Sequence, residues 1–254
     1  MTNNLNKTEI TTLDNIRDKY YMKPVLSRIN KIIETGINKK LLWKKMFDEI
    51  HTIMVESKKD VDKLLVKREK AGEIKSKDQA RKSIAGAVFS NTIMYIFIKN
   101  KELGAISKDI FITSKYKNLK GFEKISTIHV DKETQKPDCD LVIYKLKENE
   151  QLDKCMIVSL KTSLRERAGQ TYKWKLLMEI ASSENAIKNK YNIKYNPEQF
   201  PLIVFATVNF YNEINNPQHR GMFKFFDKSF IAKNIDADFI SRMSTIVDYL
   251  KNWQ

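Results

Sequence analysis

The chain has 254 residues, and 46 Lys and Arg against 31 Asp and Glu give it a formal net charge of +15. Because 42% of the residues are hydrophobic, the chain can bury a core, and we expect the positive charge on a folded surface rather than on a disordered tail. The sequence contains no apolar run of about 18 residues and no charged-then-apolar leader. These features argue against a membrane-spanning or exported protein.

Cysteine and histidine are scarce in the chain. The two cysteines, Cys139 and Cys155, form no CxxC pair, and the three histidines are scattered. This usage excludes a disulfide scaffold, disfavours a zinc site and favours a reducing cytoplasm. The excess of positive charge then points to nucleic acid as the partner, because clustered Lys and Arg neutralise phosphates and release counterions. The alternative is a lysine-rich composition without a nucleic-acid role.

The first part of the chain has the apolar spacing of helices. Residues 21–35 and 40–55 repeat apolar side chains every three or four positions. A charged segment, 56–77, follows and contains Gly72 as a possible helix stop. We therefore predict a helical N-terminal domain over 1–75 and a second domain over 76–254. The alternative for the charged segment is one long solvated helix.

The second part of the chain mixes strand and helix signals. Residues 78–99 predict one largely buried helix, and the tail 236–250 is also expected to be helical. Short apolar or alternating runs of strand length come between them, around one further helical stretch at 170–188. The predicted strands are 125–130, 141–146, 156–160 and 202–208. This order predicts an α+β or mixed α/β fold, with a central mixed sheet flanked by helices.

Four polar residues fall together if two of these strands form a hairpin. Two strand-like runs flank a polar link centred on 149–150, so that paired residue numbers sum to 299. Asp138 then lies opposite Lys161, and Asp140 lies opposite Ser159. Because side chains alternate between faces at period two, all four project from one face, although a β-bulge would shift this register by one.

Such a group has the composition that phosphodiester hydrolysis requires. Carboxylates can hold Mg²⁺, which polarises the phosphate and activates water, while a lysine positions that water and balances the developing charge. The alternative is an exposed cross-strand salt bridge of little energetic value. Pro137 directly before Asp138, and the apolar run on each strand, favour the functional interpretation.

Pro137-Asp138, followed after a strand by Ser159-Leu160-Lys161, resembles the PD-(D/E)xK nuclease signature, with serine in place of the second acid. The resemblance is to the CCGG-reading branch of the type II restriction endonucleases, which makes this same replacement. It spans roughly residues 80–210 and is similar to BsaWI-type enzymes. It implies a restriction-endonuclease-like core, Mg²⁺ as the cofactor, and roles for Asp138 in metal binding, Lys161 in catalysis and Ser159 in supporting the site.

The same branch carries a base-reading motif shortly after the catalytic lysine. Here Arg165-Glu166-Arg167 begins four residues beyond Lys161. Arginine can bond bidentately to guanine, and glutamate can accept from cytosine N4, each with a discrimination of roughly 1–3 kcal/mol. The three residues are therefore expected to read G·C pairs. The alternative is an ordinary charge run at the start of a helix.

The remaining metal ligand is ambiguous from the sequence. The resemblance implies a glutamate from the helix that follows Lys161, and Glu179 is the nearest after the reading motif, although it lies farther along than usual. Asp140 is the competing ligand, and Glu184 is a distant third. An upstream helix that often ends in a metal-associated glutamate has Ser90 and Asn91 there instead.

Together these features predict a type II restriction endonuclease that cuts double-stranded DNA. The resemblance implies a homodimer, possibly a higher oligomer, acting on a palindromic site that contains CCGG and leaving 5′ overhangs. The lysine-rich stretch 56–82 is a candidate phosphate-contacting surface. The competing hypotheses are a monomeric nicking or repair endonuclease of the same fold, and a DNA-binding protein without catalysis.

Overall fold

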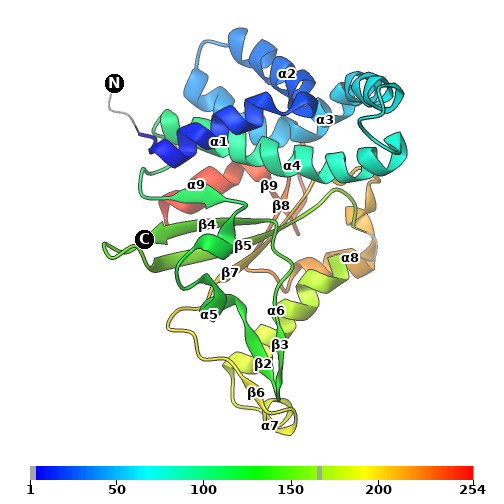
Figure 1. Ribbon diagram of the computed structural model, residues 1–254. Helices are drawn as coiled ribbons and strands as arrows, with labels where there is room; N and C mark the ends of the chain where they lie inside the picture. Colours follow the sequence, from blue (N-terminus) through cyan, green and yellow to red (C-terminus); the bar gives the residue numbers. More distant parts are fainter. Residues whose placement is uncertain (1–3, 165–167, 254) are drawn as a thin grey trace.

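A computed structural model describes residues 4–164 and 168–253. Figure 1 shows a layer of helices (blue to cyan) packed over one face of a central sheet, with further helices and a small second sheet on the other side. No helix within the described ranges combines the length and the apolar character needed to cross a membrane.

The helical layer is built from the first four α-helices. Three of them start at a side-chain cap: Asn6 and Glu9 form a capping box at the first helix, Asn38 caps the third and Ser76 the fourth. The third helix ends before Gly72, whose φ of 73° suits glycine at this position. The helices are α1 (Lys7–Asp18), α2 (Lys23–Glu34), α3 (Lys39–Lys70) and α4 (Lys77–Glu102), with a 3-10 turn, η1, at Tyr20–Met22.

The central sheet has six strands in the order β1-β4-β5-β7-β8-β9. The first three strands pair antiparallel, and the others continue in parallel from β5. The strands are β1 (Phe111–Thr113), β4 (Leu141–Leu146), β5 (Leu152–Lys161), β7 (Leu202–Thr207), β8 (Lys228–Ile231) and β9 (Ser241–Arg242). The predicted mixed sheet is confirmed.

The predicted hairpin register is confirmed along β4 and β5. Leu141 pairs with Val158, and Lys145 pairs with Lys154, so paired numbers sum to 299. A bulge follows between Lys145 and Leu146, close to the turn. Because the irregularity lies at the turn end, it leaves the register unchanged at the other end of the ladder, where Leu141 pairs with Val158; Asp138 and Asp140 lie just before this first pair.

The two faces of the sheet bury different side chains. On β5, Met156, Val158 and Leu160 join the core beneath α1–α4, whereas Cys155 and Ile157 join a second core on the opposite face. The second core contains residues of the helix that follows β5, α6 (Ala168–Ser182). Ser159 and Lys161, at odd positions, therefore lie on the α6 side.

A second sheet of three short antiparallel strands, ordered β3-β2-β6, projects beside the lower end of α6 (Figure 1). Its strands are β2 (Ile128–Val130), β3 (Glu133–Gln135) and β6 (Ile193–Lys194). The other helices are α5 (Phe122–Ser126), α7 (Ala186–Lys190), α8 (Pro217–Phe223) and α9 (Ile246–Lys251), with 3-10 turns at Tyr116–Asn118 (η2), Glu213–Asn215 (η3) and Met243–Thr245 (η4).

Some predicted elements differ from the structure. The strand at 125–130 is wrong in its first half, which ends α5, and the tail helix at 236–250 is wrong before α9 because β9 and a 3-10 turn occupy 241–245. The helix at 170–188 is two helices, α6 and α7.

The predicted domain boundary falls in the turn between α3 and α4, while one hydrophobic core runs from α1 through α4 to the sheet. The division into two domains stays a prediction.

Candidate active site

The open end of the β4–β5 hairpin brings two carboxylates to one ammonium. Lys161 ends β5, and its Nζ forms an ion pair with Asp138 and another, at 3.5 Å, with Oδ2 of Asp140. The lysine side chain is 9% exposed, whereas each aspartate side chain is 37% exposed. The charged groups therefore meet at a place where the lysine stem is packed and the carboxylates still face solvent.

The backbone also fixes Asp140. The amide of Leu160 donates to its Oδ2 at 2.7 Å, and the Asp140 amide donates to the carbonyl of Val158 at 3.1 Å. Burial raises the pKa of the Asp140 carboxyl, and the charge of Asp138 adds to this, while Lys161 and the Leu160 amide oppose it. The group is thus held rigidly beside a second carboxylate.

Ser159 connects this group to α6. It is fully buried, and its Oγ lies 2.9 Å from Oγ1 of Thr171, which is 1% exposed. Thr171 stands in the first turns of α6, so the two hydroxyls join the strand that ends in Lys161 to the helix above it. The sequence analysis missed Thr171, because no motif marks a threonine that contacts a strand.

Glu179 lies elsewhere on α6. It is eight residues beyond Thr171, which corresponds to about 12 Å along a helix axis. Its Oε1 is 2.7 Å from Nζ of Lys175, which also contacts Oδ1 of Asp227 at 2.9 Å. The structure therefore brings Asp138, Asp140 and Lys161 into contact, places Ser159 two residues before the lysine on β5, and pairs Glu179 with a different lysine. The ligand role of Glu179 stays a prediction.

The other acid positions that the sequence suggested also have their own partners. Glu184 pairs with Lys188 at 2.9 Å. Asn91 is buried in the helical layer, where its Oδ1 accepts from Nζ of Lys19 at 2.8 Å. Of the candidates for a second ligand, Asp140 is thus the one that contacts the same ammonium as Asp138.

The oxygen donors at this site suit a hard divalent cation. Mg²⁺ is commonly bound by one or two carboxylates, with water and substrate phosphates completing the octahedron. Asp138 and Asp140 supply two such carboxylates. Across the described parts of the chain, no three His, Cys, Asp or Glu side chains gather closely enough to enclose a metal by themselves. The site therefore fits a cation whose coordination water and substrate oxygens would complete.

A family model described as BsaWI restriction endonuclease type 2 matches residues 114–252, which is more than half of the chain. The chain belongs to this family. It is therefore a type II restriction endonuclease, a site-specific deoxyribonuclease whose partner is DNA. No curated protein matches the sequence at a significant level. The matched range contains the whole β4–β5 hairpin and begins after α4.

The family membership agrees with the observed fold of the endonuclease. The mixed six-stranded sheet with helices on both faces is consistent with a restriction-endonuclease-like fold. The predicted base-reading residues, Arg165, Glu166 and Arg167, lie outside the described residues. They fall between the end of β5 and the start of α6, in the segment that directly follows the candidate active site.

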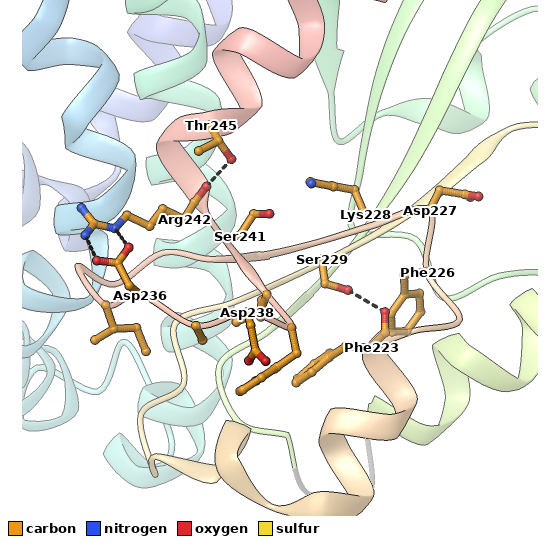
Figure 2. Close-up of a pocket in the computed structure, with 14 residues that line it drawn as sticks. Phe223, Phe226, Asp227, Lys228, Ser229, Asp236, Asp238, Ser241, Arg242 and Thr245 are labelled. Atoms are coloured by element: carbon orange, nitrogen blue, oxygen red, sulfur yellow. Dashed lines mark hydrogen bonds and ion pairs between the residues drawn. The ribbon is translucent and has the colours of Figure 1, made fainter.

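A separate cavity of about 410 Å³ opens between the ends of β8 and β9 of the endonuclease (Figure 2). Its lining includes three aspartates, of which Asp236 is held by Arg242 and Asp227 by Lys175. Figure 2 also shows the hydroxyl of Ser229 directed at the carbonyl of Phe223. None of the four hairpin residues lines this cavity. We therefore place the candidate active site at the hairpin, where the carboxylates and the lysine converge.

Proposed function

We propose that this endonuclease cuts both strands of a palindromic DNA site containing CCGG, with Mg²⁺ as cofactor and the open end of the β4–β5 hairpin as its active site. The observation that carries the proposal is the contact of one lysine, Lys161, with both Asp138 and Asp140. Together with the sequence Pro137-Asp138 and Ser159-Leu160-Lys161, this contact supports assignment to the PD-(D/E)xK superfamily.

The three charged side chains would have different roles in cleavage. Asp138 and Asp140 would hold Mg²⁺, which when bound supplies charge stabilisation at the phosphate and lowers the pKa of a coordinated water. Lys161 has three N–H donors, and its contacts with Asp138 and Asp140 use two of them. The third can orient the attacking water or donate to a phosphate oxygen as negative charge develops. Ser159, buried against Thr171, would keep the strand in place.

The specificity part of the proposal rests on the resemblance. Arg165, Glu166 and Arg167 would read the G·C pairs, and the products would carry 5′ overhangs. A palindrome is read most simply by two identical subunits related by a two-fold axis, because each active site then cuts one strand. We therefore propose a homodimer.

Plasmid cleavage tests the active site. With Mg²⁺, the wild-type protein should give discrete fragments, and sequencing their ends should place the cuts around CCGG with 5′ overhangs. Lys161→Ala and Asp138→Asn should keep DNA binding and lose cleavage. Lys145→Ala is the matched control, because Lys145 lies in the same hairpin and pairs with Asp109 at 3.0 Å. Cleavage that survives Lys161→Ala would refute the assignment, and relaxed circles from the wild type would indicate a nicking enzyme instead.

A second comparison separates the competing metal ligands. Asp140→Asn keeps an acceptor for the Leu160 amide but removes the charge, whereas Glu179→Gln removes a charge from the pair with Lys175. If Asp140 binds the metal, its variant should need far more Mg²⁺ for half-maximal cleavage, and Glu179→Gln should cut as the wild type does. The reverse pattern would assign the metal to Glu179. Sedimentation of the protein with and without a cognate duplex tests the homodimer.

A further inference from the structure

One face of the three-stranded sheet is polar, although the other is buried. Ile128 on β2 is fully buried in the second core, and Ile193 on β6 is buried there with 5% exposure. His129, the residue after Ile128, is exposed. It pairs with Thr134 of β3 on one side and with Lys194 of β6 on the other. Because cross-strand partners share a face, these three side chains form one row.

This face is hollowed and donor-rich. A depression of about 480 Å³ is lined by that row and by residues of its flanks, among them Lys124, Lys136 and Thr127. We call the surface formed by Lys124, Thr127, His129, Thr134, Lys136 and Lys194 the polar face. Its side chains carry ammonium, imidazole and hydroxyl groups, and Glu123 is the acid in the same depression. An anion would find several donors there.

A bound phosphate could displace the acids that pair with the lysines of the polar face. Lys124 pairs with Glu198 at 2.8 Å, and Lys136 pairs with Glu123 at 2.9 Å, but in both pairs the side chains are more than half exposed. Such surface pairs contribute at most about 1 kcal/mol, so an incoming phosphate can replace the acid. Lys194 has no ion pair with any other residue that the structure describes. Its positive charge is therefore available to a ligand.

A hydroxyl within the depression lacks a partner. Oγ1 of Thr127 is buried, and no hydrogen-bond partner is found for it among the described residues. Thr127 lines the same depression as Lys136 and Lys194. A buried hydroxyl without a partner is costly, and rotation of the Thr127 side chain would bring it to an acceptor oxygen bound in the depression.

The polar face leads directly to the candidate active site. Lys136 precedes Asp138 by two residues, which span about 7 Å of extended chain, and Thr134 is about 7 Å farther. Phosphates of one DNA strand follow each other at about 3.4 Å along the helix axis. A strand whose scissile phosphate lies at Asp138 would thus place phosphates about two to four nucleotides away over the polar face.

From these observations we propose that the polar face binds backbone phosphates of the DNA substrate about two to four nucleotides from the scissile bond, whatever the base sequence. Lysine ammonium groups act on phosphates as point charges and carry little base information, which is why sequence independence is expected. This inference rests on the active site proposed above, because that site fixes where the scissile phosphate lies.

The test measures equilibrium binding of a 30-bp duplex in EDTA, so that no cleavage intervenes, at several salt concentrations. Lys194→Ala is the main variant, because β6 is remote in sequence from the hairpin, and Lys136→Ala/Lys194→Ala is the second. Each lost phosphate contact should reduce the slope of log K against log salt by about 0.9, for the cognate duplex and for a scrambled one. Lys31→Ala, an exposed lysine of α2 in the helical layer, is the control of equal charge and should leave the slope unchanged.

Position is tested with duplexes that carry a neutral methylphosphonate at single sites. A methylphosphonate two to four nucleotides from the cut should weaken wild-type binding and have little further effect on Lys194→Ala. An unchanged salt slope in both lysine variants, or a methylphosphonate effect equal in the wild type and the variant, would overturn the inference. Cleavage that survives Lys161→Ala would instead overturn the proposed active site, so the two failures are distinguishable.

Discussion

Two lysines of this endonuclease hold carboxylates in opposite ways. Lys101 of α4 is completely buried, and its Nζ contacts Oε1 of Glu9 at 2.6 Å and the carbonyl of Ile110 at 2.9 Å. The Glu9 side chain is only 5% exposed. Lys161 is nearly as buried, but both of its aspartate partners are 37% exposed. The difference between the pairs is therefore the solvent access of the acids.

This difference separates a structural pair from the pair that we propose to act in catalysis. Burial lowers the pKa of Lys101, and Glu9 opposes this effect, so each charge depends on the other. Glu9 also accepts from the Asn6 amide, which ties the start of α1 to α4. No cation or phosphate can reach a pair enclosed in this way. At Lys161 the carboxylates keep solvated oxygens that a metal ion and a substrate can share.

The largest expected effect follows from breaking the enclosed pair. Lys101→Met should lower the free energy of unfolding by about 3–5 kcal/mol, because it leaves Glu9 buried without a counter-charge. Lys101→Met/Glu9→Gln should recover part of this loss, since no unpaired charge remains. Lys63→Met, which breaks an exposed pair with Asp60, should cost less than about 1 kcal/mol. Urea unfolding measures all three, and equal costs for Lys101→Met and Lys63→Met would contradict the comparison.

The open pair should behave in the opposite sense. Lys161→Met should reduce the cleavage rate at saturating DNA by about 10²–10³-fold, the range typical of a lost charge-stabilising donor. Its effect on the free energy of unfolding should be smaller than that of Lys101→Met, because Asp138 and Asp140 remain solvated. Single-turnover cleavage and urea unfolding of the same preparations provide both numbers. A variant that cuts normally but unfolds readily would place Lys161 with the structural pair.

The sequence predicted the open pair much better than the enclosed one. Once the centre of a hairpin turn is known, the numbers of paired residues have a constant sum. The turn position and the alternation of side chains were therefore enough to predict that Asp138, Asp140, Ser159 and Lys161 lie near one another. Glu9 and Lys101 are 92 residues apart. Their contact depends on how two helices pack, and no local pattern contains that information.

The helix after the hairpin shows the same limit. Its existence was predicted from apolar spacing, but the spacing does not determine which residue faces the strand. Thr171 contacts Ser159, whereas Glu179 stands beside Lys175 and Asp227. The predicted helix at 236–250 was wrong in its first part for another reason. The two-residue strand β9 is too short to show alternation, and only its parallel neighbour β8 defines it.

The buried contact between the Ser159 and Thr171 hydroxyls should affect both stability and cleavage, unlike the enclosed Lys101 pair and the open Lys161 pair. Thr171→Val keeps the shape of the side chain but leaves the Ser159 hydroxyl without its partner, so the free energy of unfolding should fall by roughly 1–3 kcal/mol. Because Ser159 and Lys161 share a strand, cleavage should slow as well. Thr171→Ser restores the hydroxyl and should restore cleavage more than stability. If Thr171→Val matches the wild type in thermal unfolding and in rate, the hydroxyl contact has no role in supporting the site.

Asp48 gives the smallest effect and tests a buried carboxylate that forms no ion pair with any residue that the structure describes. It is 6% exposed, and its Oδ1 accepts from the Ser244 amide at 2.8 Å. Burial raises the pKa of the Asp48 carboxyl, although hydrogen bonds from Ser244 and the charge of Arg242 oppose the rise. The folded state therefore binds the proton more tightly than the unfolded chain, whose Asp has a pKa of about 3.9.

The raised pKa of Asp48 makes the folded state less stable as pH rises. As pH rises from about 4 through the folded-state pKa, the folded state must give up a proton that it holds tightly, so stability falls by up to about 1.4 kcal/mol per pH unit and then levels. Asp48→Asn lacks this loss and should gain on the wild type as pH increases across that window. Asp60→Asn should show the opposite trend, because a hydrogen bond from Arg28 lowers the pKa of Asp60, so that wild-type stability is lost as pH falls. Urea unfolding from about pH 4 to 7 measures the Asp48 difference, and the Asp60 difference requires the same measurement continued below about pH 4. A flat difference for Asp48→Asn would mean that water reaches this carboxylate, which would make it resemble the open acids at Lys161 rather than the enclosed Glu9.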